Sequence, residues 1–292
     1  MRTGWIVVLV LLLILIVGGF WFFNRAPEPP VVTPPIVAPV PTGSKEVMIG
    51  QSVQGRPITA TTYGTGGKHL LFVGGVHGGY EWNSVTLAYQ FSDYLKQNPS
   101  AVPSSLSITI IPSLNPDGVF AVTGKEGRFA IPDVSTDAEV LASGRFNANK
   151  VDLNRNFACK WQPEATWKSK KVSAGTSAFS EPEAAALRDF VLASKPEAVV
   201  FWHSQANAVY ASECTAGVLP ETLAVMNTYA TAAGYPAISS FDAYPVTGDA
   251  EGWLASINIP AITVELKTHQ TIEWEQNLAG AKALINYYGT KK

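Results

Sequence analysis

Four short apolar runs, with helical patterns between and after them, constrain the fold of this chain most strongly. They are residues 69–76 (HLLFVGGV), 105–114 (SLSITIIPSL), 198–202 (AVVFW) and 261–264 (AITV). A continuous apolar run is typical of a strand that is covered on both faces. Residues 82–95 and 271–288 have a helical pattern, and 180–183 (SEPE) predicts a helix start with Ser180 as its cap. Strands that alternate with helices predict one α/β domain, in which helices flank a central mixed, largely parallel sheet.

The first 25 residues predict a membrane anchor ahead of that domain. Residues 5–23 are an unbroken run of apolar residues and glycine, long enough to cross a hydrocarbon core of ~30 Å as a helix. A cleaved signal peptide, the alternative, has a shorter apolar region followed by small residues, whereas this run ends in Phe20, Trp21, Phe22 and Phe23. Both interpretations place the rest of the chain outside the cytoplasm, at the cell surface or in the periplasm.

Residues 26–43 are rich in proline and predict an extended linker between the anchor and a folded domain at 44–292. The net charge of the chain is -2, with 15% charged residues. This near-neutral balance gives no electrostatic footprint for nucleic acid. We expect a monomer that is attached to the membrane through its N-terminal helix. Cys159 and Cys214 are the only cysteines, and we predict that they pair in an oxidising compartment.

Four polar residues directly follow the four apolar runs. His77, Asn115, His203 and Glu265 each come where a buried strand would emerge at its carboxyl end. In open α/β sheets, ligand crevices form outside that edge. A single histidine after a strand is usually structural. The chain has only four histidines, however, and two of them share this position, so we predict a functional site.

The residue types at this edge suit a catalytic zinc ion, which takes three nitrogen or oxygen ligands and keeps one position open. His77 and Glu81 come from one turn (HGGYE), and His203 comes from another strand. A carboxylate that does not bind the metal must take a proton from water and pass it to the leaving amine. Glu265 is the best candidate for this general base.

The ordered motifs HGGYE, SLNPDG, RFNANKVDLNRNF, FSEPEAAAL, WHSQ, YPVTGDAEGW and TVEL resemble those of the zinc metallocarboxypeptidases of the carboxypeptidase A and B type. They also resemble the bacterial murein-peptide amidases of that family. The resemblance implies one zinc ion held by His77, Glu81 and His203, with Glu265 as general base. It further implies that Arg145 stabilises the oxyanion, that Asn154 and Arg155 bind the substrate's C-terminal carboxylate, and that Tyr244 closes over the C-terminal residue.

The metal motif departs from the family pattern in one respect. Family members usually have two residues between the first histidine and the glutamate, whereas Gly78, Gly79 and Tyr80 intervene here. We expect Glu81 to serve as the ligand, because residues three and four apart on a turn entering a helix face the same side.

The segment YPVTGDAEGW aligns without a gap to the family's specificity loop, and Glu251 then falls at the base of the side-chain pocket. An acid there goes with a basic C-terminal residue, since a buried carboxylate needs a cationic partner. Gly252 stands where the animal enzymes usually have aspartate. The expected substrate is a peptide, and a peptidoglycan peptide ending in a diamino acid is the alternative. A non-catalytic anchored binding domain and a deacylase of small molecules are less favoured.

Overall fold

The computed structural model describes residues 43–291. The predicted anchor lies outside these residues, as does most of the predicted linker. No helix in the described part of the chain combines the length and the hydropathy needed to span a membrane.

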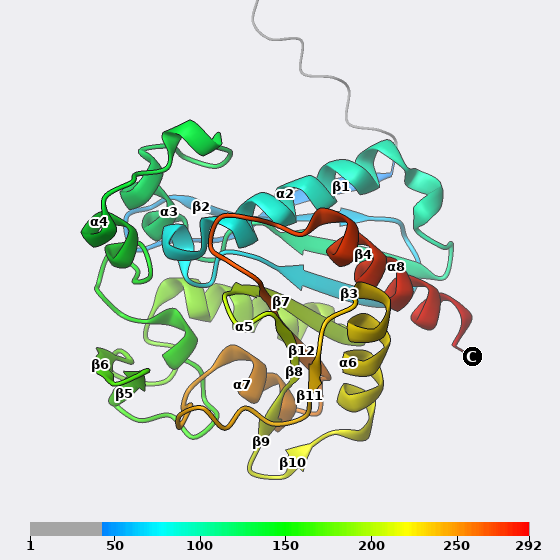
Figure 1. Ribbon diagram of the computed structural model, residues 1–292. Coiled ribbons are helices and arrows are strands. Elements are labelled where there is room, and N and C mark those ends of the chain that lie inside the picture. Colours follow the sequence, from blue (N-terminus) through cyan, green and yellow to red (C-terminus); the bar gives the residue numbers. More distant parts are fainter. Residues whose placement is uncertain (1–42, 292) are drawn as a thin grey trace, which may run out of the picture. The chain divides into compact units, whose positions relative to one another are not determined.

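A mixed eight-stranded sheet forms the centre of the domain (Figure 1), with strand order β1-β2-β4-β3-β7-β12-β8-β11. Its strands are β1 (Ser44–Gln51), β2 (Pro57–Tyr63), β3 (Lys68–Val73), β4 (Leu106–Ile111), β7 (Ala198–Ser204), β8 (Ala208–Ala211), β11 (Ala237–Ile238) and β12 (Ala261–Leu266). The four central strands β4, β3, β7 and β12 are parallel, and the outer pairs β1–β2, β2–β4 and β12–β8 are antiparallel. The predicted α/β domain with a central mixed sheet is therefore confirmed.

Helices cover both faces of the sheet. One hydrophobic cluster joins the sheet to α2 (Trp82–Gln97), α6 (Pro220–Ala233) and α8 (Trp274–Thr290). A second cluster joins the other face to α5 (Pro182–Ser194) and α7 (Ala250–Ser256). The apolar runs of the central strands are continuous because both of their faces are buried in these two cores.

Shorter elements complete the domain. They are α3 (Pro116–Thr123), α4 (Ala138–Ser143), the 3-10 turns η1 (Gly78–Glu81), η2 (Pro99–Ala101), η3 (Ile131–Asp133) and η4 (Leu153–Arg155), and the two-stranded pairs β5 (Glu164–Trp167) with β6 (Lys170–Ser173) and β9 (Glu213–Cys214) with β10 (Gly217–Val218). Of these segments, η1, η4 and β5 contribute residues to the cavity at the carboxyl ends of the central strands.

The predicted helix start at 180–183 is correct in place but wrong in its cap. Glu181, not Ser180, is the residue that precedes α5, and its side chain caps no helical N–H. The Ser180 hydroxyl instead accepts hydrogen bonds from Thr176 N (3.2 Å) and from the side chain of Asn156 (2.9 Å). A nearby loop therefore competes successfully for the group that would otherwise cap the helix.

Candidate metal centre

The carboxyl ends of β3, β4, β7 and β12 bring the predicted residues to one edge of the sheet. In the register of β7 and β12, His203 lies directly beside Glu265. Asn115 has a structural role instead, because its buried side chain caps α3 by accepting a hydrogen bond from Gly118 N (2.9 Å). Three of the four residues that follow the apolar runs therefore belong to the site.

His77, Glu81 and His203 each place a ligand-type atom within 4.8 Å of the other two. Glu81 Oε2 lies 3.0 Å from His203 Nδ1, and all three side chains are buried. His77 Nδ1 is buried without a hydrogen-bond partner, as expected of an atom in a metal site. Two imidazoles and one carboxylate are the donor set of a catalytic zinc site, so the residues present fit that ion.

The longer turn between His77 and Glu81 still brings both side chains to the site. The turn η1 is tightly packed, and Gly78 has a φ of +47°. A Cβ atom on Gly78 would lie 2.6 Å from the carbonyl oxygen of Gly144, and one on Gly79 would lie 2.5 Å from Val122. Glycine is therefore required at both positions, and the close approach to Gly144 fixes the path of the backbone into α2.

Asp152 is a buried member of the site that the sequence analysis did not single out. Its Oδ1 lies 3.4 Å from His77 Nδ1, and its Oδ2 accepts from Arg145 Nε (2.9 Å). Arg145 is itself buried, and its Nη1 lies 3.8 Å from Glu81 Oε1. The VDLNRNF motif contains Asp152, but its contact with His77 depends on a loop whose path the sequence does not reveal.

The histidines differ in their electrostatic surroundings. Burial lowers the pKa of His77 well below its usual value, which keeps the imidazole in the neutral form that binds metal. Burial also opposes the charge of His203, but the charges of Glu81 and Glu251 outweigh it and raise the pKa of His203 well above its usual value.

Glu265 faces the same cavity, and its Oε2 is buried without a hydrogen-bond partner. Burial, followed by the charge of Glu81, raises the pKa of Glu265 to about 7. A carboxyl group with a raised pKa and a free oxygen is suited to proton transfer near neutral pH.

The cavity at this edge has a volume of about 620 Å³, and all the predicted metal-binding, catalytic and substrate-binding residues line it, whereas Asn115 does not. Arg155 is buried, and it donates from Nε to Thr166 O (3.0 Å) and from Nη1 to Asn154 O (2.6 Å). Asn154 Oδ1 accepts from Ala250 N (2.8 Å) at the start of α7. Tyr244 also lines the cavity and packs edge-on against Phe241, with 4.9 Å between the ring centroids.

Glu251 lies in the first turn of α7, buried at the cavity wall. Its Oε1 accepts from Thr263 Oγ1 (3.1 Å) and lies 3.2 Å from His203 Nε2. Burial raises the pKa of Glu251, but the neighbouring His203 outweighs burial and the net shift is downward. The acids Glu213 and Asp249 line the same cavity, so this side of the site carries several carboxylates.

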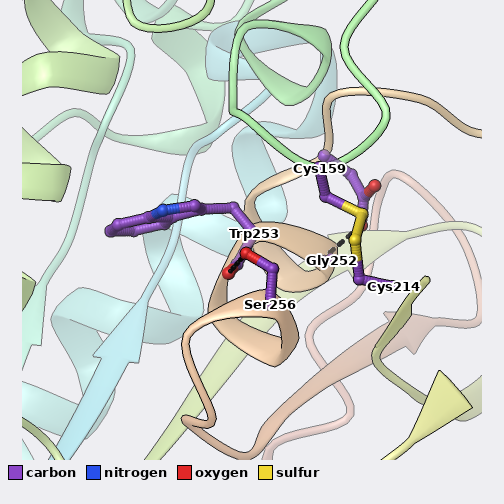
Figure 2. Close-up of a disulfide and its surroundings, with 6 residues drawn as sticks. Cys159, Cys214, Gly252, Trp253 and Ser256 are labelled. Carbon is purple, nitrogen blue, oxygen red and sulfur yellow. Dashed lines mark hydrogen bonds between the residues drawn. A yellow bond between two sulfur atoms is a disulfide. The ribbon is translucent and has the colours of Figure 1, made fainter. Parts of the chain in front are cut away.

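Cys159 and Cys214 form a disulfide, with 6.1 Å between their Cα atoms. Figure 2 shows the bridge beside α7, close to Gly252 and Trp253. Cys159 follows η4, and Cys214 lies in β9. The bridge therefore ties the segment that carries Arg155 to the segment that follows the His203 strand.

Three aromatic side chains of the cavity, Tyr80, Trp167 and His269, were also missed. His269 is one of only four histidines, and it lies four residues beyond Glu265. This proximity to a predicted site residue could have indicated that His269 belongs to the site. Trp167 ends the short strand β5, and nothing in its local pattern indicates that it reaches the site.

Comparison with protein families decides the class of the molecule. Residues 36–279 match the family described as zinc carboxypeptidase. The chain belongs to the zinc carboxypeptidase family. Its members are zinc-dependent hydrolases, so the resemblance stated from the sequence motifs is confirmed. The triad of His77, Glu81 and His203 is able to bind one metal ion, as this family requires.

The similar proteins include both a diamino acid endopeptidase and a carboxypeptidase. Gamma-D-glutamyl-L-diamino acid endopeptidase 1 of Lysinibacillus sphaericus is 24% identical over 238 residues, which are 75% of this chain and 59% of that protein. Carboxypeptidase Z of Rattus norvegicus is 32% identical over 127 residues, 39% of this chain and 18% of that protein. The chain thus spans less than two thirds of the length of each of these relatives.

Solved structures show the same fold. Murein-tripeptide amidase MpaA from Escherichia coli O157 superposes with a TM-score of 0.60 at 22% identity, over 87% of this chain and 95% of that one. Bovine thrombin-activatable fibrinolysis inhibitor superposes with a TM-score of 0.64 at 20% identity, over 85% of this chain and 89% of that one. These zinc carboxypeptidase folds include both an amidase of murein peptides and a protein crystallised with a carboxypeptidase inhibitor.

Proposed function

We propose that this protein is a membrane-anchored zinc carboxypeptidase that removes a basic C-terminal residue from peptides outside the cytoplasm. The observation that carries the proposal is that the His77, Glu81 and His203 triad shares one cavity with Glu265 and Arg155. These side chains supply a metal site, a proton-transfer group and a receptor for a carboxylate.

The metal ion, when bound to the triad, lowers the pKa of a water molecule and polarises the substrate carbonyl. Glu265 takes the proton of the attacking water on its free Oε2 and passes it to the amine of the leaving residue. Arg145, held by Asp152 with Nη1 3.8 Å from Glu81 Oε1, offers positive charge to the developing oxyanion.

Arg155 binds the free carboxylate of the substrate. Two of its donors are already used, Nε by Thr166 O and Nη1 by Asn154 O. Within residues 43–291, Nη2 has no such partner and is left for the ligand, and the two internal bonds hold the guanidinium plane in place. Asn154 and Tyr244 also line the cavity, and they enclose the C-terminal residue in this proposal.

The preference for a basic residue rests on the carboxylates beside α7. Glu251 is buried at the cavity wall, and Glu213 and Asp249 add negative charge. An ammonium or guanidinium group that enters this region meets carboxylates that are already partly desolvated and adds an opposite charge, whereas an apolar side chain adds no partner for them.

A peptidoglycan peptide is the second candidate substrate. It is favoured by the names of two relatives, a gamma-D-glutamyl-L-diamino acid endopeptidase and a murein-tripeptide amidase. The extra ammonium of a diamino acid can use the same carboxylates. Both candidates therefore share a cationic leaving residue and differ in the acyl part of the substrate.

Residues 5–23 are the basis for the proposed location, since the apolar run is long enough to span a bilayer. Membrane fractionation of the full chain, with protease accessibility of the domain from outside the cell, tests this part. Recovery of the protein in the soluble cytoplasmic fraction would contradict it.

The proposed activity is tested by digesting a peptide library and identifying the products by mass spectrometry. We expect loss of single C-terminal Lys or Arg residues, abolished by a zinc chelator. Internal cleavage, or release of N-terminal residues, would exclude a carboxypeptidase. Cleavage confined to muropeptides would select the second candidate.

A further inference from the structure

Tyr80, Trp167 and His269 form an aromatic wall on one side of the cavity. The Tyr80 ring lies 5.2 Å from the Trp167 ring and 4.6 Å from the His269 ring, measured between centroids. The three residues come from the turn before α2, from β5 and from the loop after β12. All three line the cavity and are only partly buried, so part of each ring remains accessible.

Each ring of the aromatic wall is held by contacts of its own. The Arg145 guanidinium lies 4.4 Å over the Trp167 ring. Ser204 Oγ donates to Asn83 Oδ1 (3.0 Å) and therefore accepts from His269 Nδ1 (2.7 Å). The packed glycine turn η1 fixes the backbone of Tyr80, whose N–H donates to His77 O (3.1 Å). The wall is thus formed before a ligand binds, which lowers the entropic cost of binding.

Tyr80 belongs to the segment between His77 and Glu81, which is one residue longer than is usual in the family. The family spacing leaves two residues between the ligands, and this chain has three. His77 and Glu81 still meet at the metal site, so the longer turn retains the ligands while it brings an aromatic ring to the cavity.

Part of the aromatic wall lies toward the opposite face of the sheet from Glu251. Trp167 borders both sides, because the neighbouring Thr166 O accepts from Arg155 Nε (3.0 Å). Side chains alternate along a strand. On β7, Phe201 packs in the core with α5 and α7, and His203 points to the same side of the sheet. Trp202 packs in the core with α2, and Ser204 points to that other side. His269, held by Ser204, therefore lies on the α2 side, while Glu251 belongs to α7.

We propose that Tyr80 and His269, with Trp167 at the boundary toward Arg155, form a subsite for an aromatic or bulky apolar side chain directly N-terminal to the scissile bond. This inference rests on the proposed carboxypeptidase activity. A peptide whose last residue occupies the α7 side, near Arg155 and Glu251, passes the metal site and continues toward the α2 side. There the rings present π faces and edges to the next side chain. The wall contains no acidic side chain, and Arg145 is already paired with Asp152.

Three blocked peptides test the subsite: Phe-Lys, Ala-Lys and a γ-D-Glu-Lys peptide that stands for the murein-like acyl part. For the wild type we expect kcat/KM for Phe-Lys to exceed that for Ala-Lys by about two- to tenfold, the range of a single aromatic contact. Tyr80→Ala and His269→Ala should bring this ratio close to one. Tyr210→Ala, which removes a cavity ring that packs instead against Phe241, is the matched control and should leave the ratio unchanged.

Zinc content and the preference for Lys over Leu at the C-terminus are measured in each variant, and both should be retained in Tyr80→Ala. A wild type that does not distinguish Phe-Lys from Ala-Lys, or that prefers the γ-D-Glu-Lys peptide, would overturn the subsite while leaving a peptidase. A wild type that hydrolyses none of the three would overturn the proposed function, and the subsite with it.

Discussion

The carboxylate of Glu251 lies 3.2 Å from Nε2 of His203, on the opposite side of the ring from the Nδ1 that faces Glu81. The contact is one of charge, because Nε2 has no aligned hydrogen bond. A carboxylate beside the outer nitrogen of a metal-binding imidazole orients the ring and increases its basicity. Under the proposed function, Glu251 therefore acts on two neighbours, the metal ligand His203 and the side chain of the substrate.

Substitution of Glu251 by Gln should separate these two effects. We expect the kcat/KM ratio for matched peptides ending in Lys and Leu to fall by about tenfold or more, because a buried hydrogen bond to a charged group is worth ~1.5–3 kcal/mol. Glu251→Ile should lower the ratio further. Glu213→Gln, which changes a more exposed cavity acid that accepts from Ser240 Oγ, is the control and should have the smaller effect.

Zinc affinity, measured by competition with a chelator, distinguishes the two roles of Glu251. Loss of an outer contact of this kind lowers metal affinity by about 10- to 100-fold. An unchanged Lys-to-Leu ratio with weakened zinc binding would show that Glu251 acts on His203 alone.

Metal analysis should find one zinc ion per chain, and chelation should abolish activity until zinc is returned. His203→Ala removes one of three ligands and should leave the protein without zinc. His69→Ala is the control, because this buried histidine bonds Thr109 Oγ1 (2.8 Å) outside the site, and it should retain zinc. Full activity after chelation would contradict a zinc enzyme.

The sequence predicted those parts of the site that depend on regular structure. His77, His203 and Glu265 were found because the carboxyl ends of parallel strands meet at one edge, and the sheet has that arrangement. Asp152 and Trp167 were not found, because their positions depend on how irregular segments pack over that edge. Asn115 shares the strand-end position but caps α3, which local pattern alone does not distinguish from a site residue.

Arg155→Lys should weaken recognition of the free C-terminus. Lysine retains the charge but lacks the planar fork that is held by Thr166 O and Asn154 O. We expect kcat/KM for a peptide acid to fall by about 10- to 100-fold, the equivalent of a charged hydrogen bond. A peptide amide, which lacks the carboxylate, should be a poor substrate for both proteins and should change little. An equal loss on acid and amide would assign Arg155 a structural role.

Loss of the Cys159–Cys214 bridge should destabilise the domain. The two cysteines are 55 residues apart, and a loop of that length corresponds to about 4 kcal/mol of stabilisation in the chain-entropy treatment. The double variant Cys159→Ala/Cys214→Ala should therefore unfold roughly 10 °C lower, and calorimetry measures the difference. Alkylation of exported wild-type protein without reductant should label neither thiol. Labelling of both would show that the bridge does not form in the cell.

Glu265→Gln is the sharpest test of the proposed chemistry, because it retains the shape of the side chain and removes only its capacity to accept a proton. Turnover of a Lys-ending peptide should fall by ~10² or more. Zinc content should match the wild type, since the metal is held by His77, Glu81 and His203. Binding of the peptide should also persist, because Arg155 and Glu251 are untouched. Wild-type turnover in this variant would place the proton-transfer group elsewhere in the cavity, whereas loss of zinc would show that Glu265 supports the metal instead.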